Sequence, residues 1–404
     1  MSLVTNECSW WKLFSRDARD NSDNEIESIL SQAASSDLIA FSGGFPDPAT
    51  FPTEEFLETF PEVVADPASL QYAPTLGLPG LREWFRRWLK EREGMAPGEG
   101  ELLVTSGGME GLTLLGRCLI DRGDRVMAEG PTFMGALMAL RAAGARVDAA
   151  PMDSEGLRVD DLDRDVCGPG GAPKFLYVIP DHQNPMGVSL SAERRHRLVQ
   201  IARRHGILIV EDVAYRELGF DGARLPSLYS LGPDVVAQVG TFSKTFSAGL
   251  RTGWISAPAE IVRVLARAKQ YTDQCSAALG QMLLERYGRS GGFDRGIASA
   301  RSFYASRSRA LTRALETHLP AGVEYTHPTG GFFSWLTVPD SVDSIALREE
   351  ALAEGVSYVP GTAFYPDGRG AQELRLAYSK VPEEQIEEGA RRLGDLLSRA
   401  LRSA

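Results

Sequence analysis

A regular alternation of short apolar runs with segments of helical period begins near residue 80 and constrains this chain most. The stretches between the runs, such as residues 133–144 and 191–206, repeat apolar side chains at helical spacing. Strands that alternate with helices form parallel crossover units. Runs this apolar are typical of strands that are buried on both faces, so the pattern predicts one sheet with helices on both sides. The runs are ELLVTS, DRVMAE, ARVDAAP, KFLYVIP, ILIVED and VVAQVGTF.

The pattern changes after about residue 290, which predicts a second, smaller unit. A long helical stretch over 293–319 precedes the short runs GGFFSWLTVP, VSYVP and ELRLAYS and a final helix from about residue 382. This mixture is typical of an α+β domain, and 404 residues are enough for two or three domains. We therefore expect an N-terminal arm with part of the small domain over 1–70, a large domain over 71–292 and a small C-terminal domain over 293–404.

Composition excludes several classes of function. The formal net charge is −11, and a chain this acidic is a poor general binder of nucleic acid or of anionic membranes. No apolar run approaches the roughly 20 residues of a membrane helix, and the first residues lack the apolar core of a signal peptide. Four cysteines without a CxxC pair indicate a reducing compartment, so we expect a cytoplasmic protein. The five histidines form no HExxH motif, and no metal site is expected.

Reactive or polar residues follow several apolar runs, at the place where an α/β sheet binds its ligands. Asn184 comes shortly after KFLYVIP, Asp212 ends ILIVED and Lys244 follows VVAQVGTF. A lysine desolvated at a strand end can act as a nucleophile toward carbonyl groups. Taken singly, the three residues have ordinary explanations: an Asn-Pro turn, a helix N-cap and a solvated surface charge.

A second group of residues suits a flat, phosphorylated ligand. Gly107, Gly108 and Met109 open a helix directly after ELLVTS, where exposed backbone N–H groups would suit a phosphate. Phe133 follows DRVMAE, and its ring could stack on a flat ligand. A tight turn and core packing explain these residues equally well when each is considered alone.

The order of these residues along the chain narrows the range of ligands that the predicted site could bind. Asn184, Asp212, Tyr215, Lys244 and Arg251 stand at successive strand ends. Together they match the needs of pyridoxal 5'-phosphate (PLP). Its aldehyde needs a lysine, its pyridine nitrogen a carboxylate, its phenolate oxygen hydrogen-bond donors, and its phosphate cations and N–H groups.

Over essentially its whole length the chain resembles the fold-type I, PLP-dependent aminotransferases of class I/II. The combination of QNP-x-G, D-x-x-Y and a Ser-Lys pair followed by an arginine is highly specific, and GG-x-PDP-x-x-FP most resembles the 2-aminoadipate/kynurenine aminotransferase branch. The family implies a large α/β domain with a mostly parallel seven-stranded sheet covered by helices, a smaller α+β domain (an aspartate-aminotransferase-like fold) and a homodimer. The resemblance rests on FSGGFPDPATFP, LQYAPTLGLPGLR, TSGGMEG, PTF, PDHQNPMG, VEDVAYRELGF, GTFSKTFSAGLRTGW and ELRLAYS.

The resemblance implies a role for each matching residue. Lys244 is the expected Schiff-base lysine and proton carrier, and Asp212 the partner of the pyridinium nitrogen. Asn184 and Tyr215 would contact the phenolate oxygen, and Phe133 would stack on the ring. The expected phosphate contacts are Gly107, Gly108, Met109, Ser243, Arg251 and, from the neighbouring subunit, Tyr72.

The implied reaction moves the amino group of an α-amino acid to a 2-oxo acid by a ping-pong mechanism. Arg375 matches the arginine that clamps the substrate α-carboxylate, and Gly44 and Asn184 match further substrate contacts. In the branch resembled, a residue before the GG-x-PDP stretch contacts the distal end of the substrate, and alignment places Glu27 there. An acid at this point would favour a cationic or guanidino side chain, although a solvated helix face explains Glu27 equally well.

Three departures from the family pattern leave details of cofactor affinity open. The SGGM stretch lacks polar side chains that many relatives present to the phosphate. Met186 replaces the usual hydroxyl residue after Asn-Pro. His182 stands where many relatives have an aromatic or other residue, and it could stack, hydrogen-bond or simply pack.

Two alternative functions stay open. The same scaffold carries eliminases, γ-substitution enzymes, decarboxylases and oxidases, and motif residues do not determine which substrate bond breaks. Some transcription regulators use an aminotransferase-like domain as an effector sensor joined to a DNA-binding module. Here the family pattern starts by about residue 40, which leaves no room for such a module, and the charge of −11 opposes DNA binding.

Overall fold

The computed structural model describes residues 10–15, 19, 28–29, 31–32, 38–168 and 170–403. Eight strands form its central sheet: β2 (Leu102–Thr105), β3 (Arg125–Gly130), β4 (Arg146–Asp153), β5 (Gly156–Leu157), β6 (Phe175–Val178), β7 (Leu208–Asp212), β8 (Val236–Thr241) and β9 (Gly253–Ser256). Their order across the sheet is β2-β9-β8-β7-β6-β3-β4-β5. Strands β4, β3, β6, β7 and β8 are parallel to their neighbours in this row, whereas β9 lies antiparallel between β8 and β2.

The expected mostly parallel seven-stranded sheet is confirmed, with one short strand added at its edge. The two-residue strand β5 extends the seven longer strands by pairing antiparallel with the end of β4. The sequence pattern does not predict β9, because β9 returns beside β8 through the loop that carries Lys244 and not through a helix.

Helices cover both faces of this sheet. On β6, Phe175 and Tyr177 pack into one apolar cluster with α5, α6 and α10, while Leu176 and Val178 pack into another with α7, α8 and α9. Successive side chains of a strand point to opposite faces, so a strand covered on both sides must be apolar throughout. The helices are α5 (Gly108–Leu119), α6 (Met134–Ala142), α10 (Ala259–Gln270), α7 (Val159–Val166), α8 (Ala192–His205) and α9 (Leu228–Leu231).

A third apolar cluster, rich in aromatic rings, covers the β2–β9 edge with helices α3 (Thr53–Ala65), α4 (Pro79–Glu93) and α11 (Ala278–Arg289). The sequence of α4 explains its limits. Pro79 opens the helix, where a missing N–H costs nothing, and Gly94 ends it with a φ of 74°.

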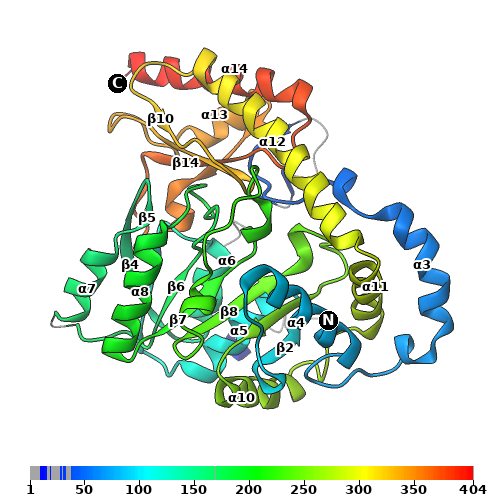
Figure 1. Cartoon of the computed structure of the whole chain (residues 1–404). Helices are drawn as coiled ribbons and strands as arrows, with labels where there is room; N and C mark the ends of the chain where they lie inside the picture. Colours follow the sequence, from blue (N-terminus) through cyan, green and yellow to red (C-terminus); the bar gives the residue numbers. More distant parts are fainter. Residues whose placement is uncertain are drawn as a thin grey trace, which may run out of the picture.

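A second, smaller unit lies above the large sheet in Figure 1. Its antiparallel sheet has the order β10-β11-β14-β13, and the long helices α12 and α14 pack against each other over it. The elements of this unit are β10 (Glu324–Tyr325), β11 (Phe333–Thr337), β12 (Val356–Ser357), β13 (Val359–Pro360), β14 (Glu373–Ala377), α12 (Gly292–His318), α13 (Arg348–Ala353) and α14 (Glu383–Ser403).

Residues 39–45 join the small unit although they precede the large sheet in sequence. Strand β1 (Ile39–Ala40) pairs parallel with β12. The backbone N–H of Ala377 donates to Phe41 O at 2.7 Å, and the Ser379 hydroxyl donates to Phe45 O at 2.7 Å. This N-terminal segment is therefore bonded to β14 and the residues after it.

Short 3₁₀ helices complete the described structure: η1 (Trp10–Leu13), η2 (Pro48–Thr50), η3 (Pro67–Leu70), η4 (Glu99–Glu101), η5 (Arg216–Leu218), η6 (Phe242–Lys244) and η7 (Gly361–Phe364). None of the helices described combines the length and the apolar character that crossing a bilayer requires.

Candidate active site

A cavity of about 420 Å³ opens at the carboxyl ends of β6, β7 and β8, where residues of the small unit complete its wall. Residues as distant in sequence as Gly44 and Arg375 meet there. The sequence-predicted residues that line it are Gly44, Gly108, Met109, Phe133, Asn184, Asp212, Tyr215, Ser243, Lys244, Arg251 and Arg375.

Lys244 ends η6, directly after β8, and its amine lies within this cavity. Its Nζ donates to the backbone oxygen of Gly44 at 3.0 Å. Burial lowers the pKa of Lys244 to about 8; the charges of Arg375 and Arg251 act in the same direction, and Asp212 opposes them. An amine with this pKa gives up its proton readily near neutral pH, as a nucleophile or general base must.

Asp212 ends β7 and is held by two donors. The Tyr177 hydroxyl, on the neighbouring strand β6, donates to Asp212 Oδ2 at 2.7 Å, and the Ala214 N–H donates to Oδ1 at 3.0 Å. Burial raises the pKa of Asp212, and the bonds from Tyr177 and Ala214 and the charge of Lys244 oppose that rise. The sequence analysis does not identify Tyr177, because its place within an apolar strand gives no sign of the contact with Asp212 on the next strand.

Arg375, Asn184 and Tyr215 form the wall on the side of the small unit. Arg375 Nη1 donates to Asn184 Oδ1 at 3.0 Å and Nη2 donates to Ser42 O at 2.7 Å. The guanidinium carbon lies 4.5 Å from the centroid of the Phe333 ring. Burial raises the pKa of the Tyr215 hydroxyl. The hydroxyl therefore stays protonated at neutral pH and can donate a hydrogen bond.

The N-terminus of α5 and the loop after β8 form a cradle for an anion. A Cβ added to Gly107, whose φ is 87°, would lie 2.4 Å from Arg251 Nη2. Arg251 itself has a φ of 50°, and its Nη1 donates to Ser243 Oγ at 3.2 Å. Thr241, which the sequence reasoning did not single out, lines the cavity and donates to Ser243 Oγ at 2.8 Å. A guanidinium, hydroxyls and free helix N–H groups are the donors that bind phosphate.

Apolar side chains make up most of the remaining wall. Ile29, Phe45 and Met134 line the cavity and belong to a small apolar cluster with Phe364 and Tyr365. Phe133, the residue before α6, also lines it and packs against that cluster.

His182 and Met186 lie beside the cavity without lining it. His182 has a φ of 48° and packs against Gly330, where an added Cβ would lie 2.4 Å from the ring. Its backbone N–H donates to Ser189 Oγ at 3.0 Å, and burial lowers the pKa of the ring. Of the three roles left open for His182, packing against glycine is the one the structure shows most directly. Met186, like Phe133, packs against the apolar cluster that contains Phe364 and Tyr365.

Tyr72 is not brought to the cavity of its own chain, and Glu27 is not among the described residues. Tyr72 is 78% exposed and does not line the cavity of its own chain. Glu27, proposed for the distal end of the substrate, lies outside the described residues.

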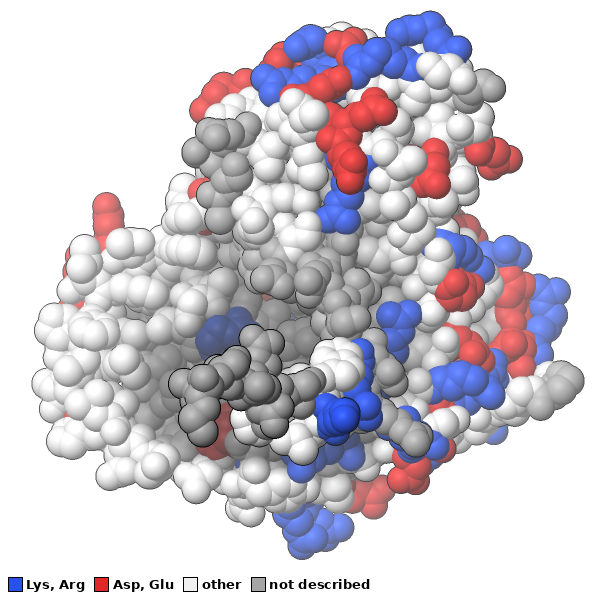
Figure 2. Space-filling model, turned by 180° about the vertical axis from the view of Figure 1, so that it is seen from behind, with Lys and Arg blue, Asp and Glu red and all other residues white. Residues whose placement is uncertain are grey.

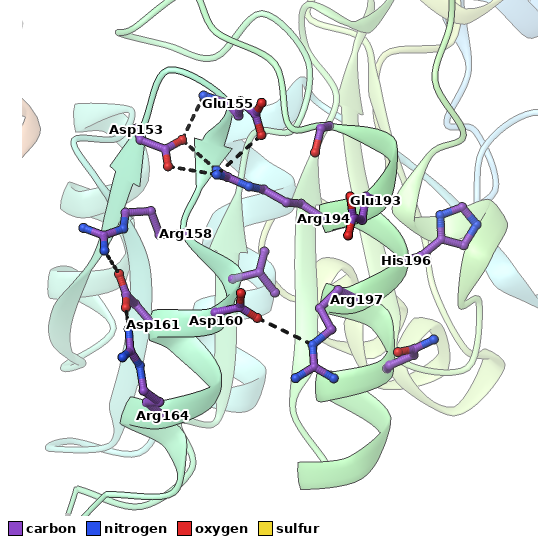
Figure 3. A pocket seen from close by; sticks show the side chains of 13 residues that line it. Asp153, Glu155, Arg158, Asp160, Asp161, Arg164, Glu193, Arg194, His196 and Arg197 are labelled. Atoms are coloured by element: carbon purple, nitrogen blue, oxygen red, sulfur yellow. Dashed lines mark hydrogen bonds and ion pairs between the residues drawn. The ribbon is translucent and has the colours of Figure 1, made fainter.

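A larger hollow of about 790 Å³ lies between α7 and α8 and is shown in Figure 3. Its charged side chains pair with one another: Arg194 lies 2.7 Å from Asp153, and Arg158 lies 2.6 Å from Asp161. Its lining includes none of the residues predicted for the site. We place the chemistry in the smaller cavity, since that is where the buried amine and carboxylate converge.

The far ends of α7 and α8 bring together the side chains of Asp163, Cys167 and His205, whose ligand atoms all lie within 4.8 Å of one another. Arg197 donates to Asp163 Oδ2 at 2.8 Å, and Arg204 approaches the same oxygen at 3.3 Å. Because two guanidinium groups already neutralise this carboxylate, we assign no metal to the cluster.

Comparison with known proteins gives consistent matches over nearly the whole chain. The family model described as aminotransferase class I and II matches residues 36–393. The chain is 36% identical over 397 residues to the aromatic-amino-acid aminotransferase 1 of Thermococcus litoralis, covering 97% of this chain and 95% of that protein. It is also 36% identical to the 2-aminoadipate transaminase of Thermus thermophilus, covering 96% and 97%. The structure of the Pyrococcus horikoshii kynurenine aminotransferase, a complex with PMP, has a TM-score of 0.94 at 35% identity, covering 98% of this chain and 99% of that one.

Proposed function

This chain belongs to the class I and II aminotransferases, and from that premise we propose which residues hold PLP and which hold the amino acid substrate. It is a PLP-dependent transaminase that acts on amino acids. That the named relatives are aminotransferases favours transfer of the amino group over elimination, γ-substitution, decarboxylation or oxidation, and over a regulatory role.

PLP fits the groups that line the cavity. Lys244 offers an amine to its aldehyde, Asp212 a buried carboxylate to its ring nitrogen, and Arg251 with the N-terminus of α5 an anion site to its phosphate. Gly107 leaves room for this cradle, because a side chain there would meet Arg251. When bound, PLP supplies an electrophilic carbon that accepts the amino group and a ring that withdraws electrons from the substrate.

Lys244 and Asp212 have different roles: Lys244 moves a proton, and Asp212 would keep one in place on bound PLP. The Lys244 amine, whose pKa burial lowers to about 8, takes the proton from the substrate α-carbon. Asp212 would keep a proton on the ring nitrogen of bound PLP, and the hydrogen bond from Tyr177 holds the Asp212 carboxylate in place. Asn184 and Tyr215 would contact the ring oxygen of bound PLP, and Phe133 would stack on its ring.

Arg375 binds the α-carboxylate of the substrate. The planar guanidinium of Arg375 can hold two carboxylate oxygens at once. Its central carbon lies 4.5 Å from the ring centroid of Phe333 and 4.9 Å from that of Phe364, so the two rings hold the guanidinium in place. Gly44 and Asn184 also line the cavity and would provide further contacts to the substrate.

The described walls favour a large apolar or aromatic substrate side chain. Ile29, Phe45 and Met134 present apolar surface, and among the described lining residues the only carboxylate is Asp212, which the ring nitrogen requires. A cationic donor would need a further acid. The prediction of a cationic donor therefore rests on Glu27. Comparing arginine-like, aromatic and 2-aminoadipate donors in wild type and Glu27→Gln tests it.

The proposal includes a cytoplasmic homodimer in which Tyr72 reaches the phosphate of the partner subunit. Leu57, Leu70 and Tyr72 are strongly exposed. The surface seen at the left in Figure 2 is mostly uncharged. Both features suit an interface between two copies. Light scattering of the purified protein tests the dimer, and a monomer at working concentration would contradict it.

The observation that carries the proposed function is the buried Lys244 amine in one cavity with Asp212 and Arg375. Lys244→Ala should abolish both the visible absorbance of lysine-bound PLP and the amino transfer. Lys90→Ala, at an exposed lysine of α4, should leave both unchanged. Borohydride reduction and peptide mapping of the loaded enzyme should label Lys244, and full turnover by Lys244→Ala would contradict the assignment.

A further inference from the structure

A network of buried ion pairs lies next to the cavity, outside the residues assigned to PLP or substrate. At its centre Asp181 accepts from Arg195 Nη2 at 2.7 Å and from Arg216 Nη1 at 2.9 Å. Arg195 is 0% exposed, and Asp181 and Arg216 are each 7% exposed. Arg216 continues the network through a two-pronged contact with Glu93, at 2.8 Å for each nitrogen–oxygen pair.

The central pair connects the two loops that bear Asn184 and Tyr215. Asp181 stands three residues before Asn184, in the loop after β6, and Arg216 directly follows Tyr215, in the loop after β7. The side chains of Asn184 and Tyr215 both line the cavity. The Asp181–Arg216 contact is thus a side-chain bridge close to both of them.

Stability alone does not account for this arrangement. The free energy lost when two charges leave water is about as large as the attraction gained between them. Well-packed apolar residues of similar volume would therefore stabilise the fold equally well. What a buried, hydrogen-bonded pair adds is a defined geometry. Arg195 reinforces it by donating to the backbone oxygens of Leu190 at 2.9 Å and Pro180 at 2.8 Å, which fixes the loop around Asp181.

We propose that Asp181 and Arg216 are positioning residues that hold the Asn184 and Tyr215 loops in register, so that both side chains donate to the same ring oxygen of PLP. The inference rests on the proposed assignment of Asn184 and Tyr215 to that oxygen. Donors at this oxygen favour its negatively charged form. When they are misplaced, the oxygen holds a proton more tightly, and the pH at which the visible absorbance of the bound cofactor changes moves upward.

The test is a pH titration of cofactor absorbance in the substrate-free holoenzyme, a readout independent of turnover. Asp181→Asn should raise the midpoint by about one pH unit, the size expected when a hydrogen bond to a charged oxygen is weakened. Arg216→Lys, which keeps the charge but loses the fork to Asp181 and Glu93, should shift it in the same direction. Asp181→Glu, which keeps the carboxylate, should shift it less than Asp181→Asn.

Two reference variants make the outcome decisive. Tyr215→Phe removes the direct donor and should raise the midpoint at least as far as Asp181→Asn. Glu217→Gln weakens ion pairs of the same network with Arg92 and Arg224 but leaves Asp181 untouched, and should leave the midpoint in place. A shift in Tyr215→Phe without one in Asp181→Asn or Arg216→Lys would overturn the positioning role. No shift in Tyr215→Phe would overturn the ring-oxygen assignment itself, and the positioning role with it.

Discussion

Replacing Tyr177 with phenylalanine tests whether a hydroxyl on β6 keeps Asp212 charged. In the native protein the fully buried Tyr177 donates to Asp212 Oδ2 at 2.7 Å. Burial already raises the pKa of Asp212, so the carboxylate depends on its donors. Tyr177→Phe removes one of the two described donors and keeps the ring that packs on the α5 side of the sheet.

The size of the effect follows from the charge on the acceptor. A hydrogen bond to a charged group contributes about 1.5–3 kcal/mol, and about 1.4 kcal/mol corresponds to one pKa unit. The pKa of Asp212 should therefore rise by about one to two units in the variant. The carboxylate is the active form, so activity is present above this pKa and is lost as the pH falls through it, and the loss should begin at a higher pH.

The assay is kcat/KM as a function of pH with one amino donor and one 2-oxo acid. Tyr177→Phe should move the acid limb of this profile upward by about one to two pH units. Tyr358→Phe is a matched control, because this buried tyrosine of the small unit donates to the neutral backbone oxygen of Ser344 at 2.6 Å. Its acid limb should stay in place. Coincident acid limbs in Tyr177→Phe and wild type would refute the role given to this hydroxyl.

Three further changes test the cradle, the carboxylate clamp and a buried acid. Gly107→Ala should weaken PLP binding by about tenfold or more in equilibrium dialysis, because the new Cβ would displace Arg251. The control is Gly123→Ala, at a φ of 91° with open space around it. Equal losses of PLP affinity in the two variants would contradict a role for Gly107 in the cradle. Arg375→Lys should lower kcat/KM for the amino donor by about tenfold or more through the loss of the planar fork, and unchanged steady-state kinetics would exclude Arg375 as the clamp. Burial raises the pKa of Glu129 from 4.5 to about 8, so the folded state binds this proton more tightly than the unfolded state, and stability falls by about 1.4 kcal/mol per unit as the pH rises through that window. Glu129→Gln should flatten this dependence in urea unfolding between pH 5 and 8, while the exposed Glu193→Gln should not; parallel slopes in Glu129→Gln and wild type would count against it.

The sequence predicted the large sheet and the gathering of Asn184, Asp212, Lys244 and Arg251 because the carboxyl ends of parallel strands converge at one edge. Arg375 came only from family resemblance, since nothing in the local pattern of β14 points to that edge. The contact from Tyr177 to Asp212 crosses between two strands whose register is set by tertiary packing, and an apolar run does not reveal it.

Single residues and short strands were harder to predict for local reasons. His182 has a φ of 48°, which is uncommon for a residue other than glycine, and its ring packs against Gly330; the sequence around it predicts neither feature. Strand β9 is four residues long and lacks a preceding helix, so the strand–helix alternation gives no sign of it.

The attachment of residues 39–45 to β14 has a mechanical consequence. Backbone and guanidinium hydrogen bonds tie the segment that contains Ser42 and Gly44 to Arg375 and the second sheet, so these residues would move together. Any hinge rotation of that sheet would part Gly44 from Lys244 and Arg375 from Asn184 in a single stroke. The contact of Arg375 with the substrate carboxylate and the hydrogen bond of Lys244 to Gly44 would then break and re-form together.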